Sequence, residues 1–421
     1  MSENPTEKAW KRIFEALPLK EQLDKTGIAR IAAAQIKEIT GREPRLMTKF
    51  DSRKSRPKTL TGANVTILPI SNGEYALLRG DGYCEIKPPN AIQAYSTGEL
   101  SRLQTISLSG GIRGESQVID TLFMVSALRT FVGDNSLRLT IRGRLRSSQF
   151  SYKFITQTSV HSISVDRVQI EVDSGYEGNK IALVEAKFGR VNDFIIRQLY
   201  YPYRDLLARG ISKEIIPILL VYSNRVYSLY SFAFPKEDEY NSIVPVGQIH
   251  YSLDEPKAPP SMADFVSPRR RTPPQGIPFP QANDLSRVFD VADLLGHGPA
   301  NKFQIARRFP VDPRQGDYYG NAVAWLGLAE KSGATFTLTA LGRSFNKMPR
   351  TDRIAELGKI LGQMPAFAEA IEARAQGTGL KANEISEIVA RDYRLSQTST
   401  GPRRANTVQS WINALAKYIE Q

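Results

Sequence analysis

The chain has 421 residues, 41% of them hydrophobic, which is enough for about three domains with buried cores. This composition excludes a disordered chain and a short peptide scaffold. The 56 Lys and Arg residues outnumber the 43 Asp and Glu residues and give a net charge of +13. Such a charge favours a polyanionic partner, and nucleic acid is the first candidate, although a basic balance alone does not identify it.

The single cysteine, Cys84, excludes an internal disulfide and a thiolate zinc site. The three histidines, His161, His250 and His297, match no metal-binding spacing. No stretch approaches 18 consecutive apolar residues, and the first residues form no apolar signal segment. We therefore expect a cytoplasmic protein that does not contact a membrane.

A proline-rich segment divides the chain, because eight prolines fall between residues 256 and 280. We interpret this segment as a surface linker between a strand-rich part and a helical part. The expected units are an N-terminal α+β region at 1–98, a core at 99–255, the linker at 256–281, and helical domains at 282–350 and 351–421.

The N-terminal region is expected to begin with amphipathic helices at 7–17 and 28–39. A basic segment at 42–58 follows, in which Arg42, Arg45 and Lys49 are candidate contacts for a polyanion. The runs VTILPI, YALLR and YCEI then predict strands, and SNGE at 71–74 predicts a hairpin turn.

The segment LRLTIRGRLR at 137–146 alternates between apolar and basic residues, as an amphipathic strand does. We expect one face to pack and the other to form a row of guanidinium groups, which is either solvated or directed at phosphates. The apolar face has Leu137, Leu139, Ile141 and Leu145, and the basic face has Arg138, Arg142, Arg144 and Arg146.

Acidic residues and a lysine are expected to meet at the end of a strand pair at 163–173 and 180–187. Asp173 ends the first strand, and Glu185 and Lys187 share one face of the second. A Glu–Lys pair on an exposed strand can simply be solvated. Here the surrounding run ALVEAK is otherwise apolar, so the charges need a compensating partner. Mg²⁺ bound by Asp173 and Glu185 is the partner that we favour.

The run IEVDSGYEGNKIALVEAKFGRVNDFIIRQLYYPYR resembles type II restriction endonucleases of the PD-(D/E)XK nuclease superfamily, as does the upstream REPRLMTKFD. The resemblance covers most of residues 28–235. It implies an α/β fold, with a mixed sheet flanked by helices, and a catalytic set of Asp173, Glu185, Lys187 and Gln198 that uses Mg²⁺. Two positions depart from the superfamily pattern, since Val172 replaces the proline before the acid and Pro202 replaces a tyrosine after the glutamine. Glu171 and Glu177 are possible additional acids.

The helical part predicts a winged helix at 284–346, made of three helices and a hairpin. Arg307, Arg308 and Arg314 flank its turn and are candidate phosphate contacts. The alternative is a helical packing domain that binds no DNA. A second winged-helix-like module is expected at 352–421, with Arg403 and Arg404 near the start of its last helix and Thr407 and Gln409 as possible base contacts.

Together these patterns favour a Mg²⁺-dependent, sequence-specific endonuclease that cuts double-stranded DNA. A homodimer is expected because cutting both strands of a symmetric site needs two active centres. The resemblance also implies a cognate DNA methyltransferase as a genetic partner. The alternatives are a non-catalytic DNA-binding regulator on a nuclease-like fold and a repair or recombination nuclease that selects DNA structure.

Overall fold

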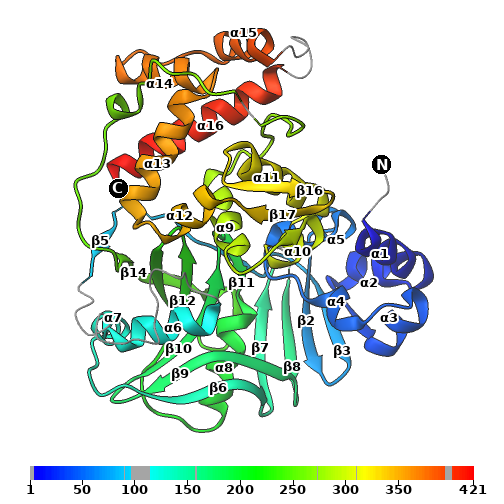
Figure 1. Cartoon of the computed structure of the whole chain (residues 1–421). Coiled ribbons are helices and arrows are strands. Elements are labelled where there is room, and N and C mark those ends of the chain that lie inside the picture. The colour runs from blue at the N-terminus through cyan, green and yellow to red at the C-terminus, as the bar shows by residue number, and fades with distance from the viewer. Residues whose placement is uncertain are drawn as a thin grey trace.

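The computed structural model of the chain has a mixed α/β fold, as expected (Figure 1). No helix within the described residues has the length and apolar character that crossing a membrane requires. The structure describes residues 4–89, 91–95, 114–156, 159–272, 274–309, 311–393 and 401–421. The expected domain boundary between residues 98 and 99 lies outside these ranges.

A seven-stranded mixed sheet forms the centre of the molecule, in the order β5-β14-β13-β12-β10-β9-β6. β10 and β12 are parallel, as are β14 and β5, and the other neighbours are antiparallel. The strands span Gln93–Ala94 (β5), Arg138–Arg146 (β6), Gln169–Glu177 (β9), Ile181–Phe188 (β10), Ile215–Ser223 (β12), Val226–Ala233 (β13) and Val244–Ser252 (β14).

Helices cover both faces of this sheet next to β10 (Figure 1). α8 (Arg197–Ala208) connects β10 to β12 and packs on one face, where Leu183 contacts the helix's aromatic residues. α6 (Glu115–Met124) and α7 (Ala127–Val132) belong to the core on the other face, together with Val184. β10 is apolar along most of its length because a strand with two covered faces has no solvent side.

The described residues of the N-terminal region form five α-helices, a short 3₁₀ helix and the three-stranded sheet β1-β3-β2. The helix expected at 28–39 is wrong in its first half, because Ile28–Ala32 is a strand. Gly27, with φ of 76°, ends the preceding helix, and the strand then pairs with β3. The turn at 71–74 is confirmed. The elements are α1 (Pro5–Ala16), α2 (Leu19–Thr26), β1 (Ile28–Ala32), α3 (Ala33–Thr40), α4 (Pro44–Thr48), the 3₁₀ helix η1 (Arg53–Ser55), α5 (Lys58–Gly62), β2 (Val65–Ser71) and β3 (Glu74–Arg79).

Two short strand pairs lie beside the central sheet. The single strand expected at 163–173 is wrong, because β8 ends at Val165 and β9 begins at Gln169. Arg167 between them has φ of 52°, which interrupts the extended chain. The pairs are β7 (Phe150–Ile155) with β8 (Val160–Val165), and β4 (Tyr83–Glu85) with β11 (Asp193–Ile195).

β6 forms an edge of the central sheet, and its apolar face does not pack as expected. Leu139 and Leu145 are 45% and 36% exposed, whereas Leu137 is buried. The register with β9 shifts on both sides of Ile141, and these irregularities break the alternation that the sequence predicted.

The helical part reproduces the expected order of three helices and a hairpin before residue 340. From residue 351 onward the described residues form helices only, so the expected second module has no wing there. The elements after the core are η4 (Tyr240–Ser242), η5 (Met262–Phe265), α9 (Leu285–Leu295), β15 (Ala300–Asn301), α10 (Lys302–Arg308), α11 (Pro313–Trp325), β16 (Ala329–Ser332), β17 (Thr335–Leu338), α12 (Ala340–Lys347), α13 (Arg350–Gln363), α14 (Phe367–Ala375), α15 (Ala382–Tyr393) and α16 (Gly401–Glu420).

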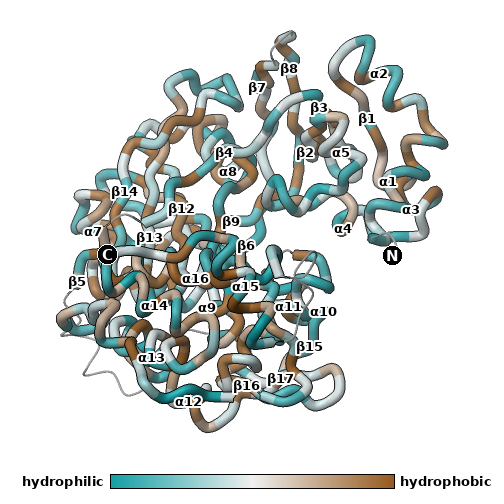
Figure 2. Tube along the Cα trace, turned by 90° about the horizontal axis from the view of Figure 1, so that it is seen from above, coloured by the Kyte–Doolittle hydropathy of each residue, from teal (hydrophilic) through white to brown (hydrophobic). Residues whose placement is uncertain are grey.

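The proline-rich segment is packed against the C-terminal helices and is not a free linker. Phe265 is buried, and a Cβ added to Gly362 would lie 1.8 Å from its carbonyl oxygen. Phe279 packs edge-on against Trp325, with ring centroids 5.4 Å apart. One hydrophobic cluster runs from the sheet through this segment into the helices, so the two halves of the chain form a continuous body. In Figure 2, α4 of the N-terminal region and α10 of the helical part face each other, and residues of both helices line one cleft.

Candidate active site

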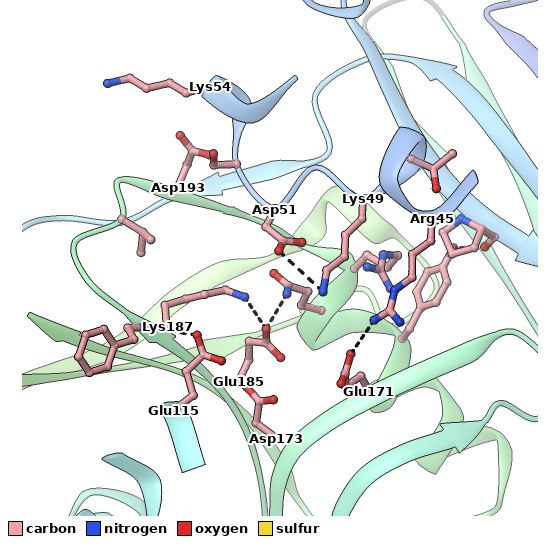
Figure 3. Close-up of a pocket in the computed structure, with 18 of the residues that line it drawn as sticks. Arg45, Lys49, Asp51, Lys54, Glu115, Glu171, Asp173, Glu185, Lys187 and Asp193 are labelled. Carbon is pink, nitrogen blue, oxygen red and sulfur yellow. Dashed lines mark hydrogen bonds and ion pairs between the residues drawn. The ribbon is translucent and has the colours of Figure 1, made fainter. Parts of the chain in front are cut away.

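A cleft of about 580 Å³ opens beside the ends of β9 and β10 (Figure 3). Three parts of the chain line it, which are the N-terminal region with residues from 45–54 and 69–75, the central sheet with α6 and α8, and the first helices of the helical part. The cleft therefore lies where segments far apart in the sequence meet.

Asp173 and Glu185 project into this cleft from neighbouring antiparallel strands. Ser174 on β9 pairs with Val184 on β10. Because the strands are antiparallel, Asp173, one residue before Ser174, lies next to Glu185, one residue after Val184. The Ala186 N–H donates a hydrogen bond of 2.8 Å to Oδ2 of Asp173. This bond fixes the first acid beside the strand that carries the second.

Glu185 is the centre of the polar contacts in the cleft. Its side chain is only 8% exposed, and its Oε1 accepts hydrogen bonds from Lys187 Nζ at 2.6 Å and from Gln198 Nε2 at 2.5 Å. Lys187 lies on the same strand face, two residues further along β10. Gln198 lies in the first turn of α8. The structure thus brings together the four residues that the sequence suggested as a catalytic set.

Burial shifts the pKa values of the two acids in the same direction. It raises the pKa of Glu185 to about 7, with Lys187 opposing the shift and Asp173 adding to it. Burial also raises the pKa of Asp173, although the Ala186 N–H opposes this. For Lys187, burial alone would lower the pKa, but the charges of Glu185 and Asp51 outweigh it and raise the pKa. The buried carboxylates are therefore destabilised as anions, and a bound cation would relieve this.

The two additional candidate acids have different positions. Glu171 lines the cleft, but it is paired with Arg45 and Arg144, each at 3.5 Å. Glu177 is four residues beyond Asp173 on β9, roughly 13 Å at the usual strand rise. It pairs with Lys213 at 2.5 Å and does not line the cleft.

Four further carboxylates in the cleft were missed in the sequence, namely those of Asp51, Glu115, Asp193 and Asp284. Glu115 begins α6, and its Oε1 accepts a hydrogen bond from the Phe188 N–H at 3.4 Å and lies 4.0 Å from Arg308. Asp51 ends the REPRLMTKFD run, and its carboxylate points into the cleft (Figure 3). Neither Glu115 nor Asp51 has a local spacing that relates it to β10, although the basic segment at 42–58 and the resemblance of REPRLMTKFD both singled out the neighbourhood of Asp51.

The donor set suits a divalent cation that needs few protein ligands. Among the described residues, no group of three or more His, Cys, Asp and Glu side chains is arranged to hold a metal ion. Asp173 accepts its hydrogen bond at Oδ2, and Glu185 accepts both of its hydrogen bonds at Oε1. The second oxygen of each remains for a ligand, and two carboxylates with water complete the coordination that Mg²⁺ prefers.

Basic residues from all three parts surround these acids. Four of the DNA contacts expected from the sequence line the cleft. Arg307 and Arg308 come from the helical part, and Arg45 and Lys49 come from the N-terminal region. The cleft also contains basic residues that the sequence did not single out, namely Lys54, Arg190, Arg197 and Arg287. The other expected DNA contacts lie outside the cleft lining, namely Arg42, Arg138, Arg142, Arg144, Arg146, Arg314, Arg403 and Arg404.

For Arg404 the expectation of a phosphate contact is wrong. Its side chain is buried, its Nη1 donates to the Pro280 carbonyl at 3.5 Å, and burial lowers its pKa to about 10. Thr407 is also buried, and its hydroxyl bonds to Asn283, so it cannot reach a base edge. Val408, Trp411 and Leu415 of the same helix belong to the hydrophobic core.

Comparison with known proteins gives families without an assigned function. Three family models match successive parts of the chain, at residues 7–77, 78–252 and 287–420. They are described as Domain of unknown function (DUF6996), Domain of unknown function (DUF6997) and Domain of unknown function (DUF7226), respectively. No curated protein and no solved structure matches the chain. Residues from all three matched segments line the cleft around Glu185.

Proposed function

We propose that the chain is a Mg²⁺-dependent endonuclease that cuts double-stranded DNA at specific sequences, as type II restriction enzymes do. The convergence of Asp173, Glu185 and Lys187 in one basic cleft is the observation that carries this proposal. Carboxylates for a divalent cation beside a lysine, surrounded by arginines, suit hydrolysis of a phosphodiester.

The arrangement around the acids supports a PD-(D/E)XK nuclease core. β9 and β10 are antiparallel and carry the acids, and α8 leads to the parallel strand β12. α6 packs on the opposite face of the sheet. The resemblance likewise implied a mixed sheet flanked by helices, which supports the proposal at this coarser level.

The order α9, β15, α10, α11, β16, β17 supports a winged helix in the helical part. Arg307 on α10 and Gln315 and Tyr319 on α11 line the cleft. A duplex held by these helices would therefore reach the acids without movement of a separate module.

In the proposed reaction the residues of the cleft have three different roles, which are cation binding, charge stabilisation and phosphate binding. Asp173 and Glu185 would hold Mg²⁺, which when bound polarises the scissile phosphate and lowers the pKa of a coordinated water. Lys187 would stabilise the charge that develops on the phosphate oxygens. Arg45, Lys49 and Arg307 would bind phosphates on either side of the scissile bond.

Incubation of the protein with Mg²⁺ and a long DNA duplex tests this function. Discrete fragments with reproducible ends are the expected result, and chelation of the metal should abolish them. A smear or a preference for branched DNA would favour a nuclease that selects DNA structure. Persistent absence of cutting with intact binding would favour a non-catalytic regulator.

Two partners belong to the same proposal. Cutting both strands of a symmetric site would require two copies of the cleft, so we propose a homodimer. A restriction enzyme of this kind also requires a cognate DNA methyltransferase in the same cell, as a genetic partner. Sedimentation of the protein with its cleaved duplex would measure the number of chains per site.

A further inference from the structure

Asp51 differs from the other acids in the cleft by having an oxygen that is buried without a hydrogen-bond partner. Its Oδ1 is the only carboxylate oxygen of the described residues that is buried without a hydrogen-bond partner. A buried acceptor without a donor is costly, so its presence at a site calls for an explanation. The carboxylates that line the cleft are Asp51, Glu115, Glu171, Asp173, Glu185, Asp193 and Asp284.

The backbone around Asp51 is held firmly against the core. The Ile195 N–H donates to the Asp51 carbonyl at 3.2 Å, and the Arg53 N–H donates to Asp193 Oδ1 at 2.7 Å. The Tyr83 hydroxyl donates to the Phe50 carbonyl at 2.9 Å. These bonds attach the segment to β11, which leads directly into α8. Asp51 thus has a fixed position relative to Glu185.

The side chain of Asp51 faces Lys187 across the cleft (Figure 3). Its Oδ2 lies 4.0 Å from Lys49 Nζ. The Asp51 charge also stabilises the ammonium form of Lys187, second among the carboxylates only to Glu185. Asp51 and Lys187 therefore interact electrostatically without a direct ion pair.

Lys187 and a divalent cation would compete for the same carboxylate. Lys187 Nζ is 2.6 Å from Glu185 Oε1, and Gln198 occupies that oxygen too. A cation bound at Glu185 would repel the ammonium group. The Lys187 side chain is only 15% exposed, so its charge needs another partner inside the cleft.

We propose that Asp51 is a positioning residue that accepts the Lys187 ammonium group when Glu185 binds the divalent cation. This inference rests on the proposed function. The move would satisfy Asp51 Oδ1 and free Oε1 of Glu185 from the lysine. Lys187 would remain charged within the cleft, where the scissile phosphate binds. The N-terminal region would then contribute to catalysis as well as to DNA binding.

A double-mutant cycle on Mg²⁺ binding tests this role without relying on cleavage. Calorimetric titration of the full chain with MgCl₂ should show that Asp51→Asn weakens binding about tenfold. In a Lys187→Ala background the same substitution should change the affinity less than about threefold, because no ammonium group needs a second partner. Asp24→Asn removes an acid of the same region outside the cleft and should leave Mg²⁺ affinity unchanged.

Two results would overturn the inference alone. A similar loss of Mg²⁺ affinity in both backgrounds would show that Asp51 is a direct ligand of the cation. No loss of affinity in the wild-type background would show that Asp51 has no role in cation binding. Thermal unfolding of each variant distinguishes these results from misfolding, and a destabilised Asp51→Asn would be replaced by Asp51→Ser in the same cycle. A wild-type protein that binds no Mg²⁺, even with duplex DNA present, would contradict the proposed function as well.

Discussion

Lys187 Nζ lies 2.6 Å from Oε1 of Glu185, and both side chains are largely buried in the cleft. A buried ion pair of this kind stabilises a fold weakly, because the cost of desolvation offsets most of the attraction. Its position beside Asp173, in a cleft lined by arginines, is better explained by the chemistry proposed for it.

Arg307 provides a test of DNA binding in the cleft, because it is exposed on α10 and lines the cleft. Arg307→Ala should weaken binding of a duplex about threefold to tenfold at 0.1 M salt. The slope of log affinity against log salt should fall by about one, since one phosphate contact is lost. Fluorescence anisotropy measures both the affinity and the salt slope, and a chelator prevents Mg²⁺-dependent cleavage during the measurement. Arg403→Ala, outside the cleft, serves as the matched control, and an equal effect there would place the DNA elsewhere.

Substitution of Glu171 tests whether this acid restrains arginines in the cleft or binds the cation. Because it pairs with Arg45 and Arg144, Glu171→Gln should release both arginines for phosphates. We expect duplex affinity to rise about twofold to fivefold at low salt, with cleavage retained, since both ion pairs are largely exposed. Loss of Mg²⁺-dependent cleavage with unchanged affinity would instead make Glu171 a ligand of the cation.

Arg404 should matter neither for DNA binding nor for activity. Its Nε is buried without a hydrogen-bond partner, so the charge is poorly compensated. Arg404→Met keeps the length of the side chain and should raise the free energy of unfolding by about 1 kcal/mol. Chemical denaturation measures this change. A tenfold loss of duplex affinity in a folded variant would restore Arg404 as a phosphate contact.

Asp290 links α9 to the loop after β10, and it should make stability depend on pH. It accepts hydrogen bonds from the Arg190 N–H at 2.9 Å and the Ser223 hydroxyl at 2.8 Å. Burial nevertheless raises its pKa from 3.8 to about 6, with Arg287 opposing. The folded state therefore binds this proton more tightly than the unfolded state. Its contribution to stability is complete below about pH 4 and is lost as the pH rises through 6.

Comparison with Asp290→Asn isolates that contribution, because asparagine does not titrate in this range. The stability of the wild type relative to the variant should fall by on the order of 2–3 kcal/mol between pH 4 and pH 7. Thermal or chemical unfolding at several pH values measures the difference. A difference that is constant over this range, or that grows with pH, would contradict the raised pKa.

The sequence predicted features that depend on local spacing. Glu185 and Lys187 lie on one strand, so the strand period brought them together, whereas Gln198 in the following helix was implied by the resemblance of that segment. The helical character of the chain after residue 350 was also predicted, and the described residues there form helices. Asp51 and Glu115 were missed because their proximity to β10 arises from tertiary contacts.

The wrong predictions from the sequence also have physical causes. The exposure of Leu139 reflects irregular pairing at a sheet edge, which alternation in the sequence does not encode. Arg404 lies four residues before Val408, on the apolar stripe of α16, so helical periodicity could have placed it inside. The proline content of 256–281 indicated a surface linker and gave no sign that Phe265 anchors the segment.

Single-turnover cleavage by Lys187→Ala tests the central claim most directly. The account predicts that wild-type protein cuts a duplex with Mg²⁺, and that Lys187→Ala cuts at least about a hundredfold more slowly while binding the duplex with similar affinity. Lys213→Ala, which removes an exposed lysine paired with Glu177 outside the cleft, should cut at the wild-type rate. Cleavage by Lys187→Ala at the wild-type rate would contradict the account.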